Sequence, residues 1–167
     1  YTRSWRLLLE YDEERLAEVP GRPVAPTAAL SLDDARAAYA RLRDDLLGRG
    51  QAGPLFGQER GDALAAILGA IEQTFGGEPL YPNAQARAAH ILYFVIKDHP
   101  FGDGNKRIGT LLFLDYLRRN GLLDHADGSP RLADNAMVAL ALLIAESDPA
   151  QKELMIRLVL SLVGDEA

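Results

Sequence analysis

Cysteine is absent from the 167 residues of this chain. Its absence excludes disulfide bonds and thiolate metal ligands, and it fits a cytoplasmic protein. Long apolar runs are lacking too, because none approaches the ~18 residues that a membrane-spanning helix needs. No signal-like segment follows Tyr1. We therefore expect no association with a membrane. Because the first residue is not methionine, we also expect that a preceding domain is missing.

The chain also lacks an excess of basic residues. It has 18 Lys and Arg residues against 24 Asp and Glu residues, for a formal net charge of −6. Domains that bind nucleic acids generally are usually basic, so we expect no general nucleic-acid binding. The hydrophobic fraction of 48% and the charged fraction of 25% are those of an ordinary globular protein. A chain of this length suits one domain with a sizeable core.

Helical periodicity dominates the chain, and strand signals are scarce. Ser31 and Asp34 resemble a capping box ahead of a helix that stops near Gly48, and Asn83 can cap the apolar segment 84–98. Further helices are expected within residues 5–16, 63–75, 105–119 and 135–146, and from residue 148 onward. The sequence therefore predicts an all-α bundle of about seven helices. Residues 31–167 form the domain, and residues 1–30 form an N-terminal extension or linker with a short helix.

The segment HPFGDGNKRIG, which begins at His99, is the most informative part of the sequence. Pro100 disfavours helical geometry at the residue before it, so the incoming helix should end there. Two glycines then allow a tight turn, and the next helix should begin near Asn105. The free N–H groups at that helix start would face an anion, with Lys106 and Arg107 adding positive charge.

Two other side chains of this segment supply reactive groups. His99 has the side chain whose ordinary pKa lies closest to neutrality, so it suits a general base. Asp103 is a hard oxygen ligand, and Mg²⁺ is often held by one or two carboxylates together with substrate phosphates. The residues alone therefore indicate a nucleotide-dependent transferase.

This segment resembles the active-site motif of the Fic/Doc family, H-x-F-x-(D/E)-G-N-G-R-x-x-R. The positions that match in register are His99, Phe101, Asp103, Gly104, Asn105 and Arg107. Lys106 stands where most members have a second glycine, and Thr110 stands where they have a second arginine. The Asn-Lys-Arg order is instead similar to Doc, the toxin of a bacterial toxin–antitoxin pair. Residues 56–119 and 145–162 resemble the C-terminal region of bacterial RhuM-type virulence proteins.

The resemblance implies a Fic/Doc-like (Fido) helical fold and a role for each residue of the motif loop, residues 99–107. His99 would take the proton from a target hydroxyl, and Asp103 would hold Mg²⁺. The nucleotide phosphates would be bound by Gly104, Asn105, Lys106 and Arg107. Phe101 would anchor the loop in the core and so hold its geometry.

Members of the family also carry a flap that grips an extended segment of the target protein by strand addition. Residues 76–82, GGEPLYP, stand at the corresponding place before the helix that leads to the motif. The residues expected to dock the target are Gly77, Glu78, Pro79 and Leu80. The alternative is a plain loop between two helices.

The resemblance favours transfer of the γ-phosphate of ATP to a Ser, Thr or Tyr hydroxyl of a target protein, because Lys106 is Doc-like. Transfer of AMP (AMPylation) and a catalytically silent interaction module remain alternatives.

Glu59 lacks the flanking residues of the family's inhibitory motif, so we expect it to be a surface or capping residue. A separate antitoxin or a missing N-terminal domain would then restrain the activity. The family also implies a bacterial cytoplasmic location, with secretion into a host left open.

Overall fold

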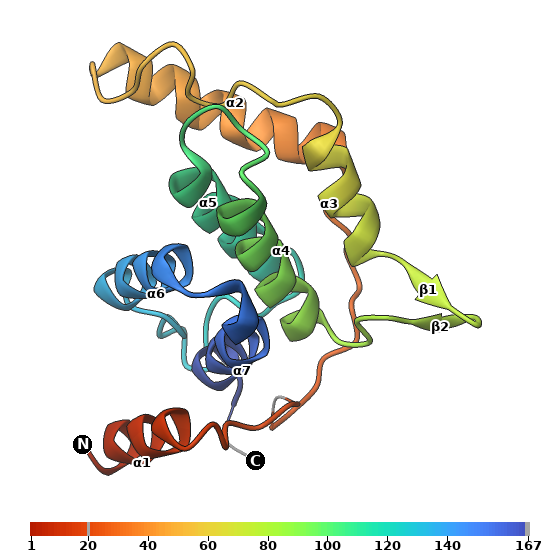
Figure 1. Cartoon of the computed structure of the whole chain (residues 1–167), viewed down its shortest axis with the longest axis vertical. Coiled ribbons are helices and arrows are strands. Elements are labelled where there is room, and N and C mark those ends of the chain that lie inside the picture. Colours follow the sequence, from red (N-terminus) through yellow and green to blue (C-terminus); the bar gives the residue numbers. More distant parts are fainter. Residues whose placement is uncertain (20, 166–167) are drawn as a thin grey trace.

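One helix, α4 (Ala84–Asp98), forms the centre of the fold (Figure 1). The computed structural model describes residues 1–19 and 21–165. Most side chains of α4 are buried, and alanines supply several of them, so neighbouring helices can approach closely. The helices that pack against α4 are α3 (Ala63–Ile71), α5 (Asn105–Arg119), α6 (Asp134–Glu146) and α7 (Lys152–Val163). The predicted all-α class is therefore confirmed.

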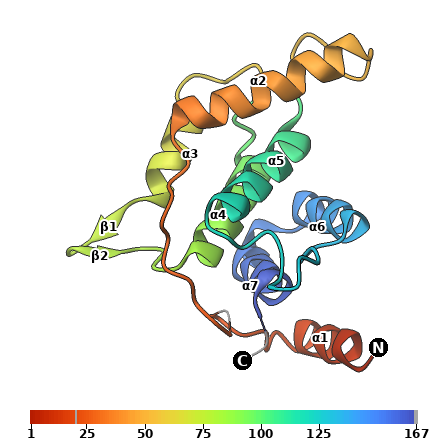
Figure 2. The same ribbon diagram turned by 180° about the vertical axis from the view of Figure 1, so that it is seen from behind.

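Two further helices lie at opposite ends of this bundle (Figures 1 and 2). Helix α2 (Leu32–Gly48) begins as predicted, because the Ser31 hydroxyl accepts a hydrogen bond of 3.0 Å from the Asp34 N–H. Helix α1 (Thr2–Asp12) packs against α7, and it begins and ends earlier than the sequence suggested. None of the helices within residues 1–19 and 21–165 has the length and apolar content needed to cross a bilayer.

A short hairpin follows α3, and it corrects the predicted end of that helix. The expected helix over residues 63–75 stops at Ile71, because two short strands follow: β1 (Thr74–Phe75) and β2 (Glu78–Pro79). The strands pair antiparallel across Gly76 and Gly77, which both have positive φ. A two-residue turn with this backbone geometry favours a hairpin, and it draws the residues before it into a strand.

The segment before α2 is fastened to the central helices by two amide side chains. Gln85 of α4 accepts a hydrogen bond from the Val24 N–H and donates one to the Arg22 carbonyl. Asn120, just after α5, accepts from the Thr27 N–H at 2.9 Å and donates to the Ala28 carbonyl at 2.9 Å. The predicted domain boundary at residue 31 stays a prediction, but the residues just before it follow the surface of the bundle.

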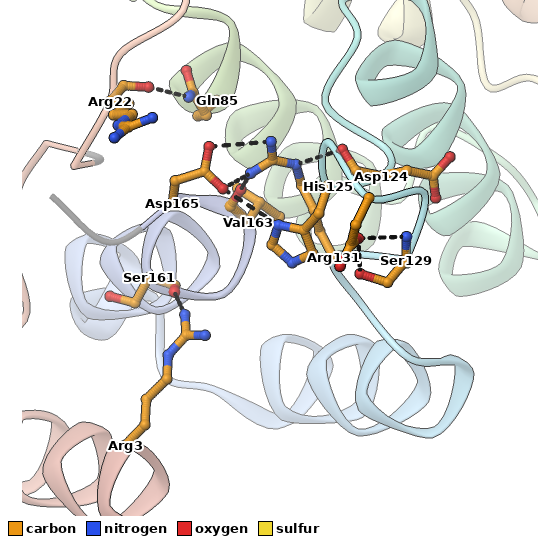
Figure 3. A network of polar contacts seen from close by, with 11 residues as sticks. Arg3, Arg22, Gln85, Asp124, His125, Ser129, Arg131, Ser161, Val163 and Asp165 are labelled. Atoms are coloured by element: carbon orange, nitrogen blue, oxygen red, sulfur yellow. Dashed lines mark hydrogen bonds and ion pairs between the residues drawn. The ribbon is translucent and has the colours of Figure 1, made fainter.

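A polar network ties the loop after α5 to the end of α7 (Figure 3). Arg131, whose side chain is 8% exposed, donates to the Asp165 carboxylate at 2.7 Å and to the Val163 carbonyl at 3.1 Å. His125 lies 3.3 Å from the same carboxylate, so it is part of this network. A 3₁₀ turn (Pro149–Gln151) precedes α7, and the Asp148 side chain caps it.

Candidate active site

The motif loop connects the end of α4 to the start of α5, beside α2 (Figure 1). Helix α4 ends at Asp98, as predicted from Pro100. His99 then adopts the left-handed backbone conformation, with φ of +49°, and its side chain is exposed. Such a conformation is strained for a residue other than glycine, so the surrounding structure must hold it in place.

A neighbouring segment supplies that support. We call residues 56–60 the brace, because they run beside the motif loop and bond to its backbone. Three hydrogen bonds cross between them, from the Gly57 N–H to the Asp103 carbonyl (3.1 Å), from the Gly102 N–H to the Gln58 carbonyl (2.8 Å) and from the Arg60 N–H to the Pro100 carbonyl (2.8 Å). This pairing was not predicted, because a short isolated ladder leaves no periodic signal in the sequence.

Phe101 lies in the core below the motif loop. Its side chain is fully buried, and the ring of Tyr39 from α2 meets it edge-on, with 4.9 Å between ring centroids. This placement suits the anchoring role expected of Phe101, because a buried ring fixes the backbone on both sides of it.

The Asn105 side chain closes the motif loop from within. Its oxygen accepts from the Phe101 N–H at 3.0 Å, and its nitrogen donates to the Phe101 carbonyl at 3.0 Å. These two bonds fix the orientation of the amide, so an N–H also faces His99 Nδ1 at 3.3 Å. That contact is a hydrogen bond when Nδ1 carries the lone pair of the neutral ring. Asn105 therefore positions the loop and the histidine, a role that the sequence did not suggest.

A polar hollow of about 330 Å³ opens at the junction of the motif loop and α5. The residues that line it are Ile96, His99, Gly102, Asp103, Gly104, Asn105, Lys106, Arg107 and Ala145. It therefore contains every residue expected to act as base, metal ligand or phosphate ligand. The first-turn N–H groups of α5, which have no acceptor inside the helix, lie at this end. Together with Lys106, they make the hollow suitable for an anion.

Phe56 of the brace shapes the start of α5. Gly104 has φ of +89°, and a Cβ at this position would lie 2.5 Å from Phe56 Cδ2, so only glycine fits against the ring. The Arg107 guanidinium lies over the same ring, 4.6 Å from its centroid. Arg107 also donates to the Gln51 carbonyl at 3.0 Å, so it borders the hollow in a fixed position.

Asp103 is the carboxylate of the hollow. Its side chain is 52% exposed and its nearest cationic partner is Arg107, 3.9 Å away. Within residues 1–19 and 21–165, no group of three or more His, Cys, Asp or Glu side chains could hold a metal ion. A single accessible carboxylate nevertheless fits Mg²⁺, which keeps several waters and is commonly held by one protein carboxylate plus substrate phosphates.

A second, apolar hollow of about 410 Å³ adjoins the first. It lies between α2, α5 and α6, and its lining includes Leu46, Leu111, Met137 and Leu142. Lys106 and Arg107 line both hollows, so the polar and apolar compartments meet at these two cations. Thr110, where the family has a second arginine, also lines the apolar hollow and donates to the Lys106 carbonyl at 2.8 Å.

The residues expected to dock a target lie elsewhere. Gly77, Glu78, Pro79 and Leu80 form the turn and second strand of the hairpin, at the end of α4 that is far from His99 (Figure 1). Helix α4 has 15 residues, which corresponds to about 22 Å along its axis. Residues 76–82 are thus partly extended rather than a plain loop, but the structure separates them from the motif loop.

Three residues near the motif loop were not predicted to matter. Arg36 and Tyr39 of α2 both bond to Glu59 of the brace. The Glu59 side chain is 20% exposed and its carboxylate accepts three hydrogen bonds, so Glu59 is a partly buried surface residue that also joins α2 to the brace. No local pattern indicated this cluster, since Glu59 is 23 positions from Arg36 and 20 positions from Tyr39.

The motif loop thus places a histidine, a carboxylate and the free N–H groups of a helix start around one hollow of a mostly helical domain. Residues 29–117, more than half of the chain, match the family model described as "Fic/DOC family". The chain belongs to the Fic/Doc family, a family of protein-modifying transferases. Comparison with curated proteins and with solved structures gave no match.

Proposed function

We propose that this protein transfers a phosphate-containing group from a nucleotide to a hydroxyl group of a target protein. The observation that carries the proposal is the polar hollow, where His99, Asp103 and the start of α5 meet. A base, a carboxylate and an anion-binding helix start within one hollow are the groups that phosphoryl or nucleotidyl transfer needs.

In the proposed reaction, the target hydroxyl takes the place of the Asn105 amide at His99 Nδ1 and gives its proton to the lone pair of this nitrogen, while the hydroxyl oxygen forms a bond to phosphorus. The bond from phosphorus to the leaving phosphate oxygen breaks at the same centre, releasing ADP in phosphotransfer or pyrophosphate in AMP transfer. The first-turn N–H groups of α5, Lys106 and Arg107 stabilise the negative charge on the phosphate oxygens. When bound at Asp103, Mg²⁺ would neutralise part of that charge.

The two adjoining hollows support a nucleotide as donor. A nucleotide joins anionic phosphates to a flat, largely apolar base, and here a polar compartment adjoins an apolar one. Lys106 and Arg107 stand at the boundary, where they can contact the phosphates. We propose ATP, with Mg²⁺, as the donor.

We favour transfer of the γ-phosphate over transfer of AMP. Lys106 brings a flexible cation to a position where glycine would leave the hollow wider. Thr110 has no charge and its hydroxyl is bonded to the helix backbone, so it does not replace the family's second arginine. The alternative, transfer of AMP, keeps the same base and the same hollow but reverses the nucleotide.

The experiment that tests the proposal uses two parallel reactions of the protein with a bacterial lysate and Mg²⁺. One contains ATP labelled at the γ-phosphate, and the other contains ATP labelled at the α-phosphate. We expect a protein band labelled only from the γ-position. A band labelled from the α-position would establish AMP transfer, and the absence of label from both would favour the silent interaction module.

Two variants make this experiment specific. His99→Ala should abolish the label while leaving the helical circular dichroism spectrum intact, and undiminished labelling would contradict the role of His99 as base. Lys106→Gly should shift the product toward AMP transfer. An unchanged ratio of the two labels would show that Lys106 does not set the orientation of the nucleotide.

The hairpin is the proposed docking element for the target. An apolar hollow of about 360 Å³ lies beside α3, lined by one face of that helix together with Phe94 and Asp98 of α4. A target segment that pairs with β2 and follows this hollow would need roughly seven extended residues to reach His99.

We further propose that an antitoxin or an additional domain restrains the activity, because Glu59 is held by α2 and not by the motif arginine.

A further inference from the structure

We propose that Glu59 is a positioning residue, through which α2 holds the brace and thereby the motif loop in the geometry that transfer requires. This inference deepens the proposed function. Its kinetic test rests on that function, whereas its amide-exchange test does not. Glu59 is not among the residues that line the polar hollow. Any effect it has on transfer must therefore pass through the loop.

The hydrogen bonds of the Glu59 carboxylate all go to one helix. It accepts from Arg36 Nε at 2.9 Å, from a terminal nitrogen of Arg36 at 3.2 Å and from the Tyr39 hydroxyl at 2.7 Å. This bidentate pair with a third donor is a strong and directional arrangement. By contrast, the Glu18 side chain in the Arg157–Glu18 pair is 75% exposed and accepts a hydrogen bond of 2.7 Å from Arg157.

Two sets of contacts couple the position of the brace to that of the motif loop. The backbone route consists of the bonds on either side of Glu59, from the Arg60 N–H to Pro100 and from the Gly102 N–H to Gln58. The side-chain route runs through Tyr39, which bonds to Glu59 and packs edge-on against Phe101. Because both routes meet the loop beside His99, a displaced brace would shift the base relative to the hollow.

The titration behaviour of the cluster agrees with this geometry. The Arg36 guanidinium, together with the Tyr39 hydroxyl, holds the pKa of the Glu59 carboxyl below its ordinary value. Burial raises the pKa of the Tyr39 hydroxyl to about 12, and its hydrogen bond to Glu59 adds to this effect. Glu59 is therefore ionised and Tyr39 is neutral near pH 7, as the hydrogen bonds require.

The first measurement needs no activity. Amide hydrogen exchange, followed by NMR, reports directly on the Gly102 and Arg60 N–H groups that bond across the brace. In Glu59→Gln, which keeps the shape but removes the charge, we expect protection at both amides to fall by roughly tenfold, since charge-assisted bonds are about twice as strong as neutral ones. Protection at Leu112, inside α5, should not change. Unchanged protection at Gly102 and Arg60 would overturn the inference.

Two further variants control this comparison. Glu18→Gln removes a carboxylate charge from another ion pair with an arginine, and it should leave all three amides unchanged. Tyr39→Phe removes the hydroxyl but keeps the ring against Phe101, so it should lower the same protections by less than Glu59→Gln does. If Glu59→Gln failed to fold, as judged by circular dichroism, Tyr39→Phe would still test the inference.

The second measurement uses transfer kinetics. We expect Glu59→Gln to lower kcat by roughly tenfold to a hundredfold, because small displacements of a reacting group are costly, while KM for ATP stays within about twofold. A loss of kcat without any change in amide exchange would contradict a positioning role and indicate direct participation. If the wild-type protein transferred no label, the proposed function would fail, but the exchange data would still decide whether Glu59 holds the loop.

Discussion

The two ends of α4 carry the two segments expected to act in transfer, and they are built in opposite ways. At the C-terminal end, the motif loop is bonded to the brace along its length and anchored by the fully buried Phe101. At the N-terminal end, the hairpin has two exposed strands of two residues each, and Phe75 is 87% exposed. The hairpin is attached mainly at its base, where Arg87 binds Glu72 and the Tyr81 carbonyl.

This difference matches the two tasks proposed for them. A base and a phosphate site need fixed geometry, and strained backbone such as the left-handed His99 persists only where neighbours hold it. A docking segment needs free backbone groups and an accessible edge, which the exposed strands provide. The molecule thus places its rigid segment where chemistry is expected and its least supported segment where a partner is expected.

The largest expected effect comes from a matched pair of glycine substitutions. Gly104 and Gly77 have similar backbone angles, with φ of +89° and +85°, but a Cβ meets the Phe56 ring at Gly104 and nothing within 4 Å at Gly77. We expect Gly104→Ala to lower the free energy of unfolding by about 2–5 kcal/mol and Gly77→Ala by about 1–2 kcal/mol. Urea denaturation measures both. Equal losses would show that Phe56 does not constrain the start of α5.

The attachment of the hairpin gives the next effect. Arg87 has a side chain that is 10% exposed, and its Nε donates to the Tyr81 carbonyl at 2.8 Å. Arg87→Met should lower the free energy of unfolding by about 1.5–3 kcal/mol, because it leaves a carbonyl and the Glu72 carboxylate without their partner. Exchange at the Leu80 N–H, which bonds to the Gln73 carbonyl, should accelerate, whereas exchange at Gly102 should not.

A control for that variant lies on α2. Arg49→Met removes an exposed arginine from its pair with Asp45, where the side chains are 64% and 52% exposed. Its effect should stay below about 0.5 kcal/mol. If both variants lost the same stability, or if Gly102 exchanged faster in Arg87→Met, the two ends of α4 would not be independent.

The same contrast explains what the sequence could predict. Helix starts at Ser31 and Asn83, the helix end before Pro100 and the restart at Asn105 depend on side chains within a few positions, so local signals sufficed. The end of α3 was misplaced because the hairpin turn at Gly76 and Gly77 competes with the apolar pattern before it.

For the candidate site, the motif identified the residues around the polar hollow but not what holds them. Phe56, Tyr39 and Glu59 reach the loop only through the tertiary fold, and no spacing rule connects them to His99. Asn105 illustrates the same limit, since its amide is engaged by Phe101 and His99 in a geometry that only the folded loop creates. Residue types can indicate the chemistry of a site, whereas the contacts that hold its residues in place come from segments distant in the sequence.

A pH-dependent effect is expected at the hairpin end. His90 is buried on α4, stacks on Tyr81 with 3.9 Å between ring centroids, and has its Nδ1 2.7 Å from the Ala86 carbonyl. Burial lowers the pKa of His90 below its ordinary value of 6.5. The unfolded chain therefore binds a proton more readily than the folded chain. The contribution of His90 to stability is complete above pH 6.5 and is lost as the pH falls through the lower folded pKa.

Denaturation at a series of pH values measures this loss. The wild-type protein should lose more stability on acidification than His90→Gln, which cannot take up the proton. NMR should show the ring of Tyr81 and the hairpin amides changing before those of the motif loop. A variant and wild type with parallel pH profiles would show that His90 is not a source of acid sensitivity.

The substitution with the smallest expected effect on stability tests most directly the contrast between the motif loop and the hairpin. Phe75 is 87% exposed on β1, so Phe75→Ser should change the free energy of unfolding by less than about 0.5 kcal/mol. If the hairpin docks the target, the same change should raise KM for the target protein by roughly tenfold, which corresponds to the burial of one aromatic side chain. The value of kcat should hardly change, because the motif loop lies at the other end of α4.

Leu9→Ser provides the matched control, since Leu9 is 52% exposed on α1 and distant from both segments. It should alter neither KM nor kcat. A lower kcat in Phe75→Ser with KM unchanged would mean that the hairpin acts on the motif loop, so the two ends of α4 would be coupled. Unchanged kinetics in both variants would remove the hairpin from target binding and leave the 360 Å³ hollow beside α3 as the surface to examine. Either result would show that exposure of an apolar side chain is not enough to identify a docking site, because the partner's contacts decide which exposed groups contribute binding energy.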